Sequence, residues 1–354
     1  MPIPTTSSRF RKLLRATASR IPRGFSLLEL LVATVVLSLI LVVLFSILDT
    51  TTTLWARGSS RIQSFQEARA AYEAVTRKLS QATLNIYWAY DTNSAGDPAG
   101  YRRKSELQFV SGPSDKLLSS PGTSRTHSVF FVSHLGYTTN AAYSTLQSTL
   151  NAGGYYIAFE SDDDANRPAF ISGSVGSRSR FRLKEVWQPT ESLSLYSNAP
   201  TAALPGAWYS TNQSATLAEN IIALVIRPRL PEREDPTGSA LVTKPGFVYN
   251  SAASNNYTAV SSTGASITGN TLHQLPPLVQ VTMVAIDEKS AARFANGQTP
   301  PDYGVTNWSQ LFADPDPVQL AKDLQSLEAG LISNGITYQI FDSLVPIEGA
   351  KWSR

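Results

Sequence analysis

Hydrophobic positions divide the chain into three parts. Residues 30–48 contain no charged side chain and only three polar ones, Thr34, Ser38 and Ser46. From Ile62 to Ile86 apolar residues recur every three or four positions, which is the period of an amphipathic helix. From Tyr87 onward short β-type runs alternate with Gly, Pro, Ser and Asn. The pattern predicts an apolar helix, then an amphipathic helix, then a β-rich domain.

The apolar segment is long enough to cross a membrane. At about 1.5 Å per residue, residues 25–48 would form a helix of about 36 Å, against a bilayer core of about 30 Å. Residues 1–24 hold six basic side chains and no acidic one. Basic residues before a span favour a cytoplasmic N-terminus. We therefore expect one span, with the rest of the chain on the far side of the membrane.

The remainder of the chain is expected to fold as one β-rich domain with long insertions. In Leu278–Ile286 apolar residues alternate, as in a half-buried strand, and a short helix should follow to Ala295. Leu320 to Leu331 mark another helix after Pro317. Residues 188–215 and 232–271 have the composition of surface loops. The other strand candidates are Glu106–Val110, Ser128–Val132, Tyr155–Phe159, Phe181–Trp187, Ile221–Ile226 and Thr337–Phe341.

Composition excludes several kinds of chemistry. The chain of 354 residues has no cysteine, so disulfides, thiolate zinc sites and cysteine nucleophiles are ruled out. Its net charge of +3 comes from residues 1–24, because the rest holds 24 Lys and Arg against 27 Asp and Glu. Without a cluster of basic residues in that larger part, we expect no nucleic-acid partner.

Candidate catalytic and metal-binding residues are few. The three histidines, His127, His134 and His273, lack metal-ligand spacing, and no nucleophile elbow or phosphate-binding glycine loop occurs. Asp162, Asp163 and Asp164, with Glu160 and Asn166 close by, form the best oxygen-ligand cluster. They lack the spacing of an EF-hand loop, so a solvated acidic turn is the main interpretation and a calcium site the alternative. We expect no enzymatic activity and no cofactor.

An aromatic cluster follows the second predicted helix. Tyr87, Trp88, Tyr90 and Tyr101 lie close together in the sequence. Our interpretation is that they pack the helix onto the sheet, and the alternative is that they contact a partner protein.

Glu29 is the most informative residue of the apolar segment. A secretory signal peptide would have a shorter apolar core followed by an A-x-A-like site, which is missing here. A plain membrane anchor fits the length but gives no role to Glu29. A carboxylate near the start of a spanning helix costs several kcal/mol unless it is neutralised or paired. A functional role for Glu29 is therefore the default hypothesis.

A third interpretation accounts for this carboxylate. The sequence Gly24-Phe25-Ser26-Leu27-Leu28-Glu29, after a basic leader and before an uncharged apolar helix, resembles the processing site of type IV prepilins and type II secretion pseudopilins. The resemblance implies that a membrane prepilin peptidase cleaves after Gly24 and methylates the new amine of Phe25. It also implies that Glu29 meets the N-terminal amine of a neighbouring subunit and sets the register of assembly.

The resemblance also implies a fold and an organisation. The fold class would be α+β and type IV pilin-like, with a long N-terminal helix packed on an antiparallel sheet. Residues 1–24 would be a removed leader, 25–48 the transmembrane helix, 49–87 the amphipathic stalk helix and 88–354 a periplasmic β-rich domain. The implied partners are the peptidase, other pilin or pseudopilin subunits and an assembly platform in the inner membrane.

Two segments further along resemble strands of J-class minor pseudopilins and related minor pilins. They are Leu217–Arg227, which is similar to an "LxExIxxLxxR" strand, and Leu275–Thr282, which is similar to an "LPxxVxVTL" strand. Residues 345–353 resemble the tail of a prepilin-like family from Verrucomicrobia-type gene cassettes. The expected function is that of a structural subunit in a secretion or pilus filament. The alternatives are a membrane-tethered adhesin or ligand-binding module acting through its insert loops, and an anchored periplasmic enzyme.

Overall fold

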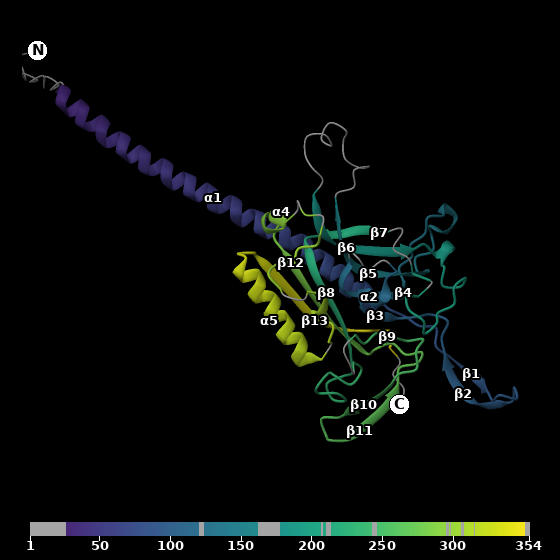
Figure 1. Cartoon of the computed structure of the whole chain (residues 1–354). Helices are drawn as coiled ribbons and strands as arrows, with labels where there is room; N and C mark the ends of the chain where they lie inside the picture. The colour runs from purple at the N-terminus through teal and green to yellow at the C-terminus, as the bar shows by residue number, and fades with distance from the viewer. Residues whose placement is uncertain are drawn as a thin grey trace, which may run out of the picture. The chain divides into compact units, whose positions relative to one another are not determined.

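The computed structural model describes residues 26–119, 124–161, 178–206, 208–209, 214–242, 246–294, 297, 299–305, 308–314 and 316–350. The chain divides into two compact units, residues 1–59 and residues 60–354, which are described separately. One helix, α1 (Leu27–Ser80), contributes residues to both. All β-strands belong to the second unit (Figure 1).

In the first unit, α1 has the length and composition of a membrane-spanning helix over Leu27–Thr52. Its Leu, Val and Ile side chains are exposed along this whole stretch. The few polar side chains within it bond back to the helix itself. Thr34 donates to the Leu31 carbonyl at 2.9 Å, and Ser38 to the Val35 carbonyl at 2.8 Å. Such bonds satisfy a hydroxyl that would otherwise face hydrocarbon alone.

In the second unit, the apolar stripe of α1 is buried as its spacing predicts. Ala68, Tyr72, Val75 and Leu79 lie in the core, one turn after another. The helix ends at Ser80, seven residues before the expected end at residue 87. Beyond it the Thr83 amide donates to the Val132 carbonyl at 2.9 Å, so the chain pairs beside a strand instead of continuing the helix.

The larger sheet has six antiparallel strands in the order β7-β6-β5-β4-β3-β9. Neighbours along the chain are neighbours in space from β3 to β7, as in a meander. Long apolar runs in the central strands are buried, including Val129–Val132 and Tyr155–Phe159. The bounds are β3 (Val110–Pro113), β4 (Ser124–His134), β5 (Leu150–Ser161), β6 (Ser179–Gln188), β7 (Ser214–Glu219) and β9 (Tyr249–Asn250).

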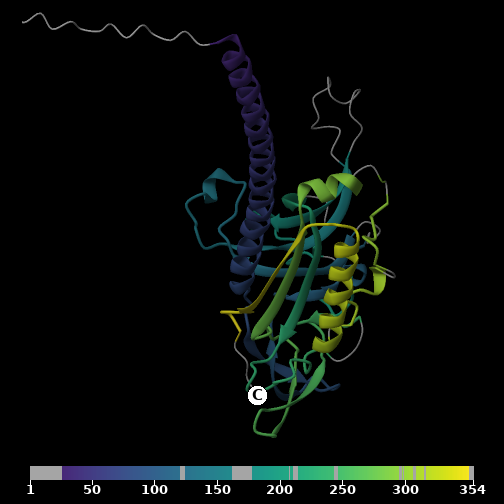
Figure 2. The ribbon, with the colours of Figure 1, turned by 90° about the vertical axis from the view of Figure 1, so that its left-hand side faces the viewer.

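The smaller sheet has three antiparallel strands, in the order β13 (Tyr338–Pro346), β12 (Leu278–Ile286) and β8 (Ile221–Arg229). A helix covers each face. Tyr72 of α1 stacks on Phe341 with ring centroids 5.5 Å apart. The adjacent Ile340 lines a groove with Leu324 of α5 (Pro317–Ser333). Because successive strand residues point to opposite faces, α1 and α5 lie on opposite sides of this sheet (Figure 2).

A single residue, Asn220, separates β7 of the larger sheet from β8 of the smaller one. It has a φ of +62° and ends β7 of the larger sheet immediately before β8 of the smaller one. Asparagine tolerates this left-handed conformation better than most residues. The side-chain amide of Asn220 donates to the Glu288 carboxylate at 2.7 Å, at the start of α4 (Glu288–Phe294). The segment Leu217–Arg227, expected as one strand, is therefore two strands in different sheets.

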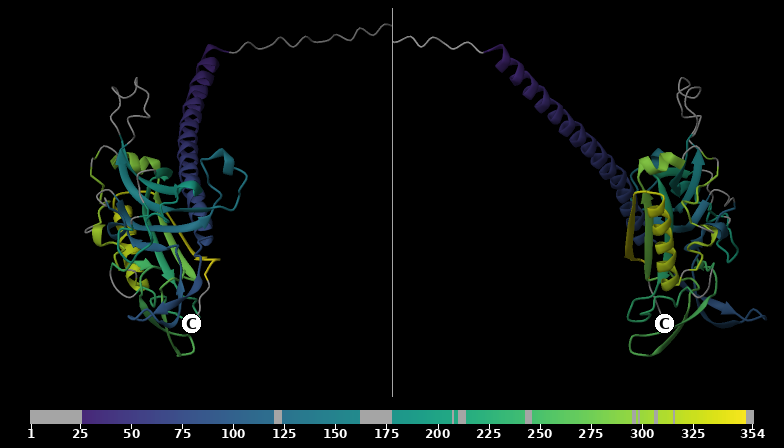
Figure 3. Two further views of the ribbon diagram at one scale, coloured as in Figure 1. Left: turned by 90° about the vertical axis from the view of Figure 1, so that its right-hand side faces the viewer. Right: turned by 60° about the vertical axis from the view of Figure 1, so that its left-hand side comes forward.

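Two hairpins stand outside the main sheets, and neither is among the expected strands. One joins β1 (Tyr87–Thr92) to β2 (Pro98–Lys104) and extends away from the rest of the domain (Figure 3). The other joins β10 (Asn256–Val260) to β11 (Ser266–Asn270). The second hairpin and β9 lie within residues 232–271, which were expected to form a loop. The short helices are α2 (Ser114–Leu117), η2 (Ala141–Tyr143), η4 (Thr190–Ser192) and η5 (Trp308–Gln310).

Other expected elements are confirmed with small changes of bounds. The strand expected at Glu106–Val110 instead begins at Val110. The Asn85 side chain accepts hydrogen bonds from the amides of Glu106 and Leu107 at 3.0 and 3.2 Å, so these donors are not free for a sheet. The described residues of 188–215 form a largely exposed loop, as expected, which is anchored where Trp208 and Tyr209 are buried and Tyr209 stacks on Phe130 at 4.2 Å.

Candidate functional site

The start of α1 is built by reciprocal hydrogen bonds between Ser26 and Glu29. The Ser26 amide and hydroxyl donate to the Glu29 carboxylate at 3.1 and 3.2 Å, and the Glu29 amide donates to the Ser26 hydroxyl at 3.2 Å. This is a capping box, in which both side chains satisfy amides that the first helical turn leaves unpaired. The carboxylate is also placed at the positive end of the helix dipole.

Gly24 and Phe25, the expected processing site, lie outside the described residues. Glu29, the expected assembly residue, lies within them, three residues beyond the N-cap. Ser26 was not singled out from the sequence, although Ser-Leu-Leu-Glu before an apolar run has the spacing of a capping box. Glu29 is thus the carboxylate in the first described turn of α1, and it lies against Ser26.

The two strand motifs of the C-terminal half lie side by side. Val281 in β12 is the register partner of Ile226 in β8. Arg227, which ends the first motif, is buried and donates to the Gln280 side chain and the Gly238 carbonyl, both at 2.9 Å. Glu219 in the same motif pairs with Arg180 and Arg182 of β6. Arg227 thus links the two motifs through Gln280, while Glu219 holds β7 to β6 within the larger sheet.

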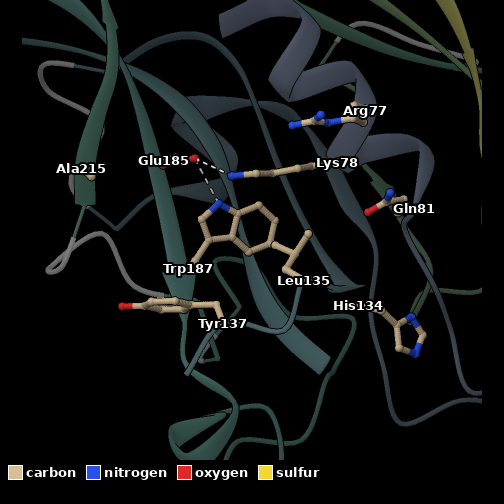
Figure 4. Close-up of a pocket in the computed structure, with 9 residues that line it drawn as sticks. All are labelled: Arg77, Lys78, Gln81, His134, Leu135, Tyr137, Glu185, Trp187 and Ala215. Carbon is tan, nitrogen blue, oxygen red and sulfur yellow. Dashed lines mark hydrogen bonds and ion pairs between the residues drawn. The ribbon is translucent and has the colours of Figure 1, made fainter. Parts of the chain in front are cut away.

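A groove of about 660 Å³ lies where the end of α1 meets β6 (Figure 4). Lys78 forms an ion pair with Glu185 at 3.0 Å and lies over the Trp187 ring, 5.2 Å from its centroid. The indole of Trp187 donates to the same Glu185 carboxylate at 3.2 Å. Lys78, Glu185 and Trp187 are thus paired with one another, and they join α1 to the larger sheet.

The aromatic cluster after α1 does not pack the helix onto the sheet, contrary to the main interpretation of the sequence. Trp88, Tyr90 and Tyr101 are 64%, 57% and 68% exposed. Tyr90 is the register partner of Tyr101, and Trp88 of Arg103, so all four side chains share one face of the β1–β2 hairpin. The two tyrosine rings lie 4.8 Å apart. The hairpin thus presents an aromatic face to solvent.

The three histidines lie in three different places. His127 is buried, accepts from the Ile226 amide through Nδ1 at 3.1 Å and donates from Nε2 to the Phe312 carbonyl at 2.9 Å. Burial lowers its pKa below the ordinary value. Burial also lowers the pKa of His273, helped by the positive charges of the nearby residues 102–104. His134 is exposed at the groove of Figure 4.

Asp162, Asp163 and Asp164, the candidate calcium ligands, lie outside the described residues, as does Asn166. Glu160, the nearby carboxylate, is described, and it accepts a hydrogen bond from Lys184 at 2.9 Å. Within the part of the chain that the structure describes, His, Asp and Glu side chains form no cluster of three suited to a metal ion.

Comparison with known proteins identifies the N-terminal segment. Residues 20–45 match the family model described as the prokaryotic N-terminal methylation motif. No curated protein and no solved structure shows a significant match to the chain. The chain therefore carries the N-terminal motif of type IV prepilin-like proteins, on a helix that could span a membrane once. This motif implies processing by a prepilin peptidase and assembly with other pilins.

Proposed function

We propose that the chain is a minor pseudopilin- or pilin-like structural subunit of a filament in a type II secretion-like or type IV pilus-like system. A prepilin peptidase would cleave after Gly24 and methylate Phe25. The mature subunit would be held in the inner membrane through its apolar helix, with the β-rich domain in the periplasm. It would catalyse no reaction and need no cofactor, and its partners would be other subunits and the assembly platform.

The observation that carries this proposal is the methylation motif over residues 20–45, with Glu29 at the start of an exposed apolar helix. Cleavage at Gly24 would create a cationic amine on Phe25, one helical turn from Glu29. In an apolar bundle an unpaired amine and an unpaired carboxylate are both costly, while a pair between neighbouring subunits compensates both. Pairing would favour one axial register over others.

The pairing of the two strand motifs supports the assignment to the minor, J-like subunits. Leu217–Arg227 and Leu275–Thr282 share one sheet through β8 and β12, and the buried Arg227 of the first motif donates to Gln280 of the second. Both motifs thus belong to the framework of the domain.

The experiment that tests the proposal is intact mass and N-terminal sequencing of the protein from its native membrane. A mature chain that begins at methylated Phe25 is the expected result. An uncut chain would show a plain anchor, and a chain that begins after Leu48 would show a secreted protein. Either result would overturn the proposed role of Glu29.

A second function is favoured by the exposed aromatic face of the β1–β2 hairpin. A membrane-tethered adhesin or ligand-binding module could use this face, or the insert segments 188–215 and 232–271, to hold its ligand. Exposed Trp and Tyr side chains are typical of binding hot spots. Retention of the chain on its target surface, lost in Trp88→Ala/Tyr101→Ala and kept in Trp55→Ala, would support this function over the purely structural one.

A further inference from the structure

The smaller sheet ends in a strand that has a partner on one side alone. β13 pairs with β12 along its nine residues without a register shift, and it is the outermost strand of that sheet (Figure 3). A strand at a sheet edge presents backbone groups to which another extended chain can bind. Natural proteins protect long edges with Lys, Pro or a bulge. β13 has no Lys and no bulge, and its one proline, Pro346, is its last residue.

The outward backbone groups of β13 belong to every second residue. At the two ends of its register, the Asp287 amide donates to the Thr337 carbonyl and the Ile347 amide to the Pro277 carbonyl. Odd-numbered residues of β13 therefore point their backbone groups at β12, and even-numbered ones point away from it. No described residue outside the sheet bonds to the outward amides. These amides are those of Tyr338, Ile340, Asp342 and Leu344.

The opposite edge of the same sheet is closed. There β8 lies next to β4, and side chains of β4 accept from its amides. The Leu224 amide donates to Thr126 Oγ1 at 3.0 Å, and the Ile226 amide donates to His127 Nδ1 at 3.1 Å. Within the described residues, the fold thus satisfies donors at the β8 edge and leaves those at the β13 edge without a protein partner.

A mainly apolar groove lies beside the β13 edge. It has a volume of about 740 Å³ and is lined by one face of α5 and by Ile340 of β13. Val318 in its lining is 63% exposed, and Leu344 further along β13 is 47% exposed. On an added strand, the residue opposite Ile340 would place its side chain on the same face, in this groove. Strand addition would therefore cover apolar surface and pair the outward amides together.

Charge defines a second position of the added strand. Asp342 is exposed, lies on the α5 side of the sheet and forms no ion pair with a described residue. Its Oδ1 accepts from the Thr282 hydroxyl at 2.5 Å, whereas Oδ2 has a long bond of 3.4 Å from Gln280. The charged residues of the groove, Lys322 and Glu328, balance each other, so Asp342 leaves a net charge of −1. A Lys or Arg opposite Asp342 would form a favourable cross-strand pair.

We propose that the β13 edge binds an extended segment of a partner polypeptide by strand addition. The segment would carry an apolar residue opposite Ile340, Lys or Arg opposite Asp342, and an apolar residue opposite Leu344. A second copy of the chain fits poorly, because Asp342 is the one charged residue of β13 and self-pairing would bring another carboxylate to this edge. The proposal depends neither on N-terminal processing nor on filament assembly.

The test is hydrogen–deuterium exchange of the full-length chain in detergent micelles, read by mass spectrometry of the peptic fragments that contain β13. The probe is the capped peptide acetyl-Thr-Val-Thr-Lys-Thr-Val-Thr-amide. One control peptide has Glu in place of Lys. Another is N-methylated at its five central residues, which keeps the side chains and removes the backbone donors. We expect the Lys peptide to slow exchange of the outward amides to saturation, the Glu peptide to need a higher concentration, and the N-methylated peptide to have no effect.

A variant of the chain tests the charge pair. Asp342→Asn removes the negative charge and keeps an acceptor for Thr282. It should reduce the preference for the Lys peptide over the Glu peptide about two- to fivefold, which is the effect of one cross-strand charge pair. Asp97→Asn, in the turn of the exposed β1–β2 hairpin, is the matched control and should keep the full preference.

Four results would overturn the proposal. Three concern the peptides: no slowing of exchange by the Lys peptide, equal binding of the Lys and Glu peptides, or equal slowing by the N-methylated peptide. The fourth is slow exchange of the outward amides in the chain alone, with a dimeric mass in native mass spectrometry, because a second copy would then cover the edge. The comparison of peptides on the unmodified chain decides the question even if Asp342→Asn does not fold.

Discussion

Glu29 accepts two hydrogen bonds from Ser26, one from its amide and one from its hydroxyl, at 3.1 and 3.2 Å. The same carboxylate therefore has a local role in starting the helix and, as proposed, an intermolecular role in assembly. The two roles make different demands. A cap needs a hydrogen-bond acceptor, whereas the pairing of subunits needs a negative charge.

Two substitutions separate these roles. Glu29→Gln keeps the acceptor of the capping box and removes the charge, so we expect the chain to be processed and folded but lost from filaments. Ser26→Ala keeps the charge and removes the hydroxyl, which costs about 1 kcal/mol of helix stability, and should assemble. The measurement is the fraction of the chain in sheared filaments relative to membranes. Assembly of Glu29→Gln at the level of the unmodified sequence would refute the role of the charge.

The ion pair between Lys78 and Glu185 should contribute to stability more than the ion pair between Arg69 and Glu73 of α1. Both of its side chains are at most one-quarter exposed, whereas Arg69 and Glu73 are 73% and 64% exposed. Lys78→Met leaves the Glu185 carboxylate with the Trp187 indole alone, and we expect a loss of about 1–2 kcal/mol. Arg69→Met should cost less than about 0.5 kcal/mol. Urea unfolding gives the free energy of unfolding of the two variants. Equal losses of stability in both variants would contradict this prediction.

Gly153 in β5 allows the Trp187 side chain to lie against the backbone. A Cβ at this position would collide first with the backbone carbonyl oxygen of Val186 and would also come within 2.6 Å of Trp187 Cε3. Gly153→Ala should therefore destabilise the domain by about 1–3 kcal/mol through overpacking. Gly100→Ala, where a Cβ would meet nothing within 4 Å, is the control and should leave the unfolding midpoint nearly unchanged. A stable Gly153→Ala variant would mean that the β6 backbone at Val186 and the indole of Trp187 can both move aside.

Stability should fall as the pH drops below the ordinary pKa of histidine, about 6.5. Burial lowers the pKa of His127 in the folded state, and the charge of Arg227 acts in the same direction. The unfolded chain therefore binds a proton at His127 more readily than the folded chain. The stability that comes from keeping His127 neutral is complete above pH 6.5 and is lost as the pH falls toward the lowered pKa. The slope reaches at most about 1.4 kcal/mol per pH unit for one group.

The check is chemical unfolding of His127→Gln at pH 7.5 and pH 5.5. Glutamine can accept from the Ile226 amide and donate to the Phe312 carbonyl without titrating. Its stability should depend less on pH than that of the unmodified chain. His134→Gln, at an exposed site, should keep the full dependence. An unchanged slope in His127→Gln would assign the pH dependence to other groups, such as His273.

Local patterns in the sequence predicted the main elements because these patterns are strong. The apolar stretch before Leu48 is exposed and the stripe from Phe65 to Leu79 is packed on the domain, each over many residues. The strand expected at Leu278–Ile286 is present, but it is not half-buried, because α1 and α5 cover both faces of its sheet and all residues from Val281 to Ile286 are buried. The bounds of β12 agree with the expected strand. At these positions local propensity and tertiary packing favour the same structure.

Other features depend on contacts between distant residues, which no local pattern reveals. The β1–β2 hairpin is rich in aromatic residues, as a buried strand would be, yet its aromatic face is exposed. The end of α1 depends on backbone pairing with β4, and the break at Asn220 depends on the distance between two sheets. At the candidate site, Glu29 was predicted from the sequence, while the Lys78–Glu185 pair joins residues 107 positions apart.

The Tyr72 hydroxyl donates to the Ser343 hydroxyl at 2.6 Å, across 271 positions of the chain. The helix that emerges first from the ribosome therefore finds one of its docking partners only in β13, close to the last described residue. Synthesis at about 5–20 residues per second imposes a delay of roughly 15–50 seconds between these two side chains. During that interval the apolar stripe of α1 has no smaller sheet to cover it. This topology therefore leaves the stripe without its complete docking surface until synthesis of the chain is nearly finished.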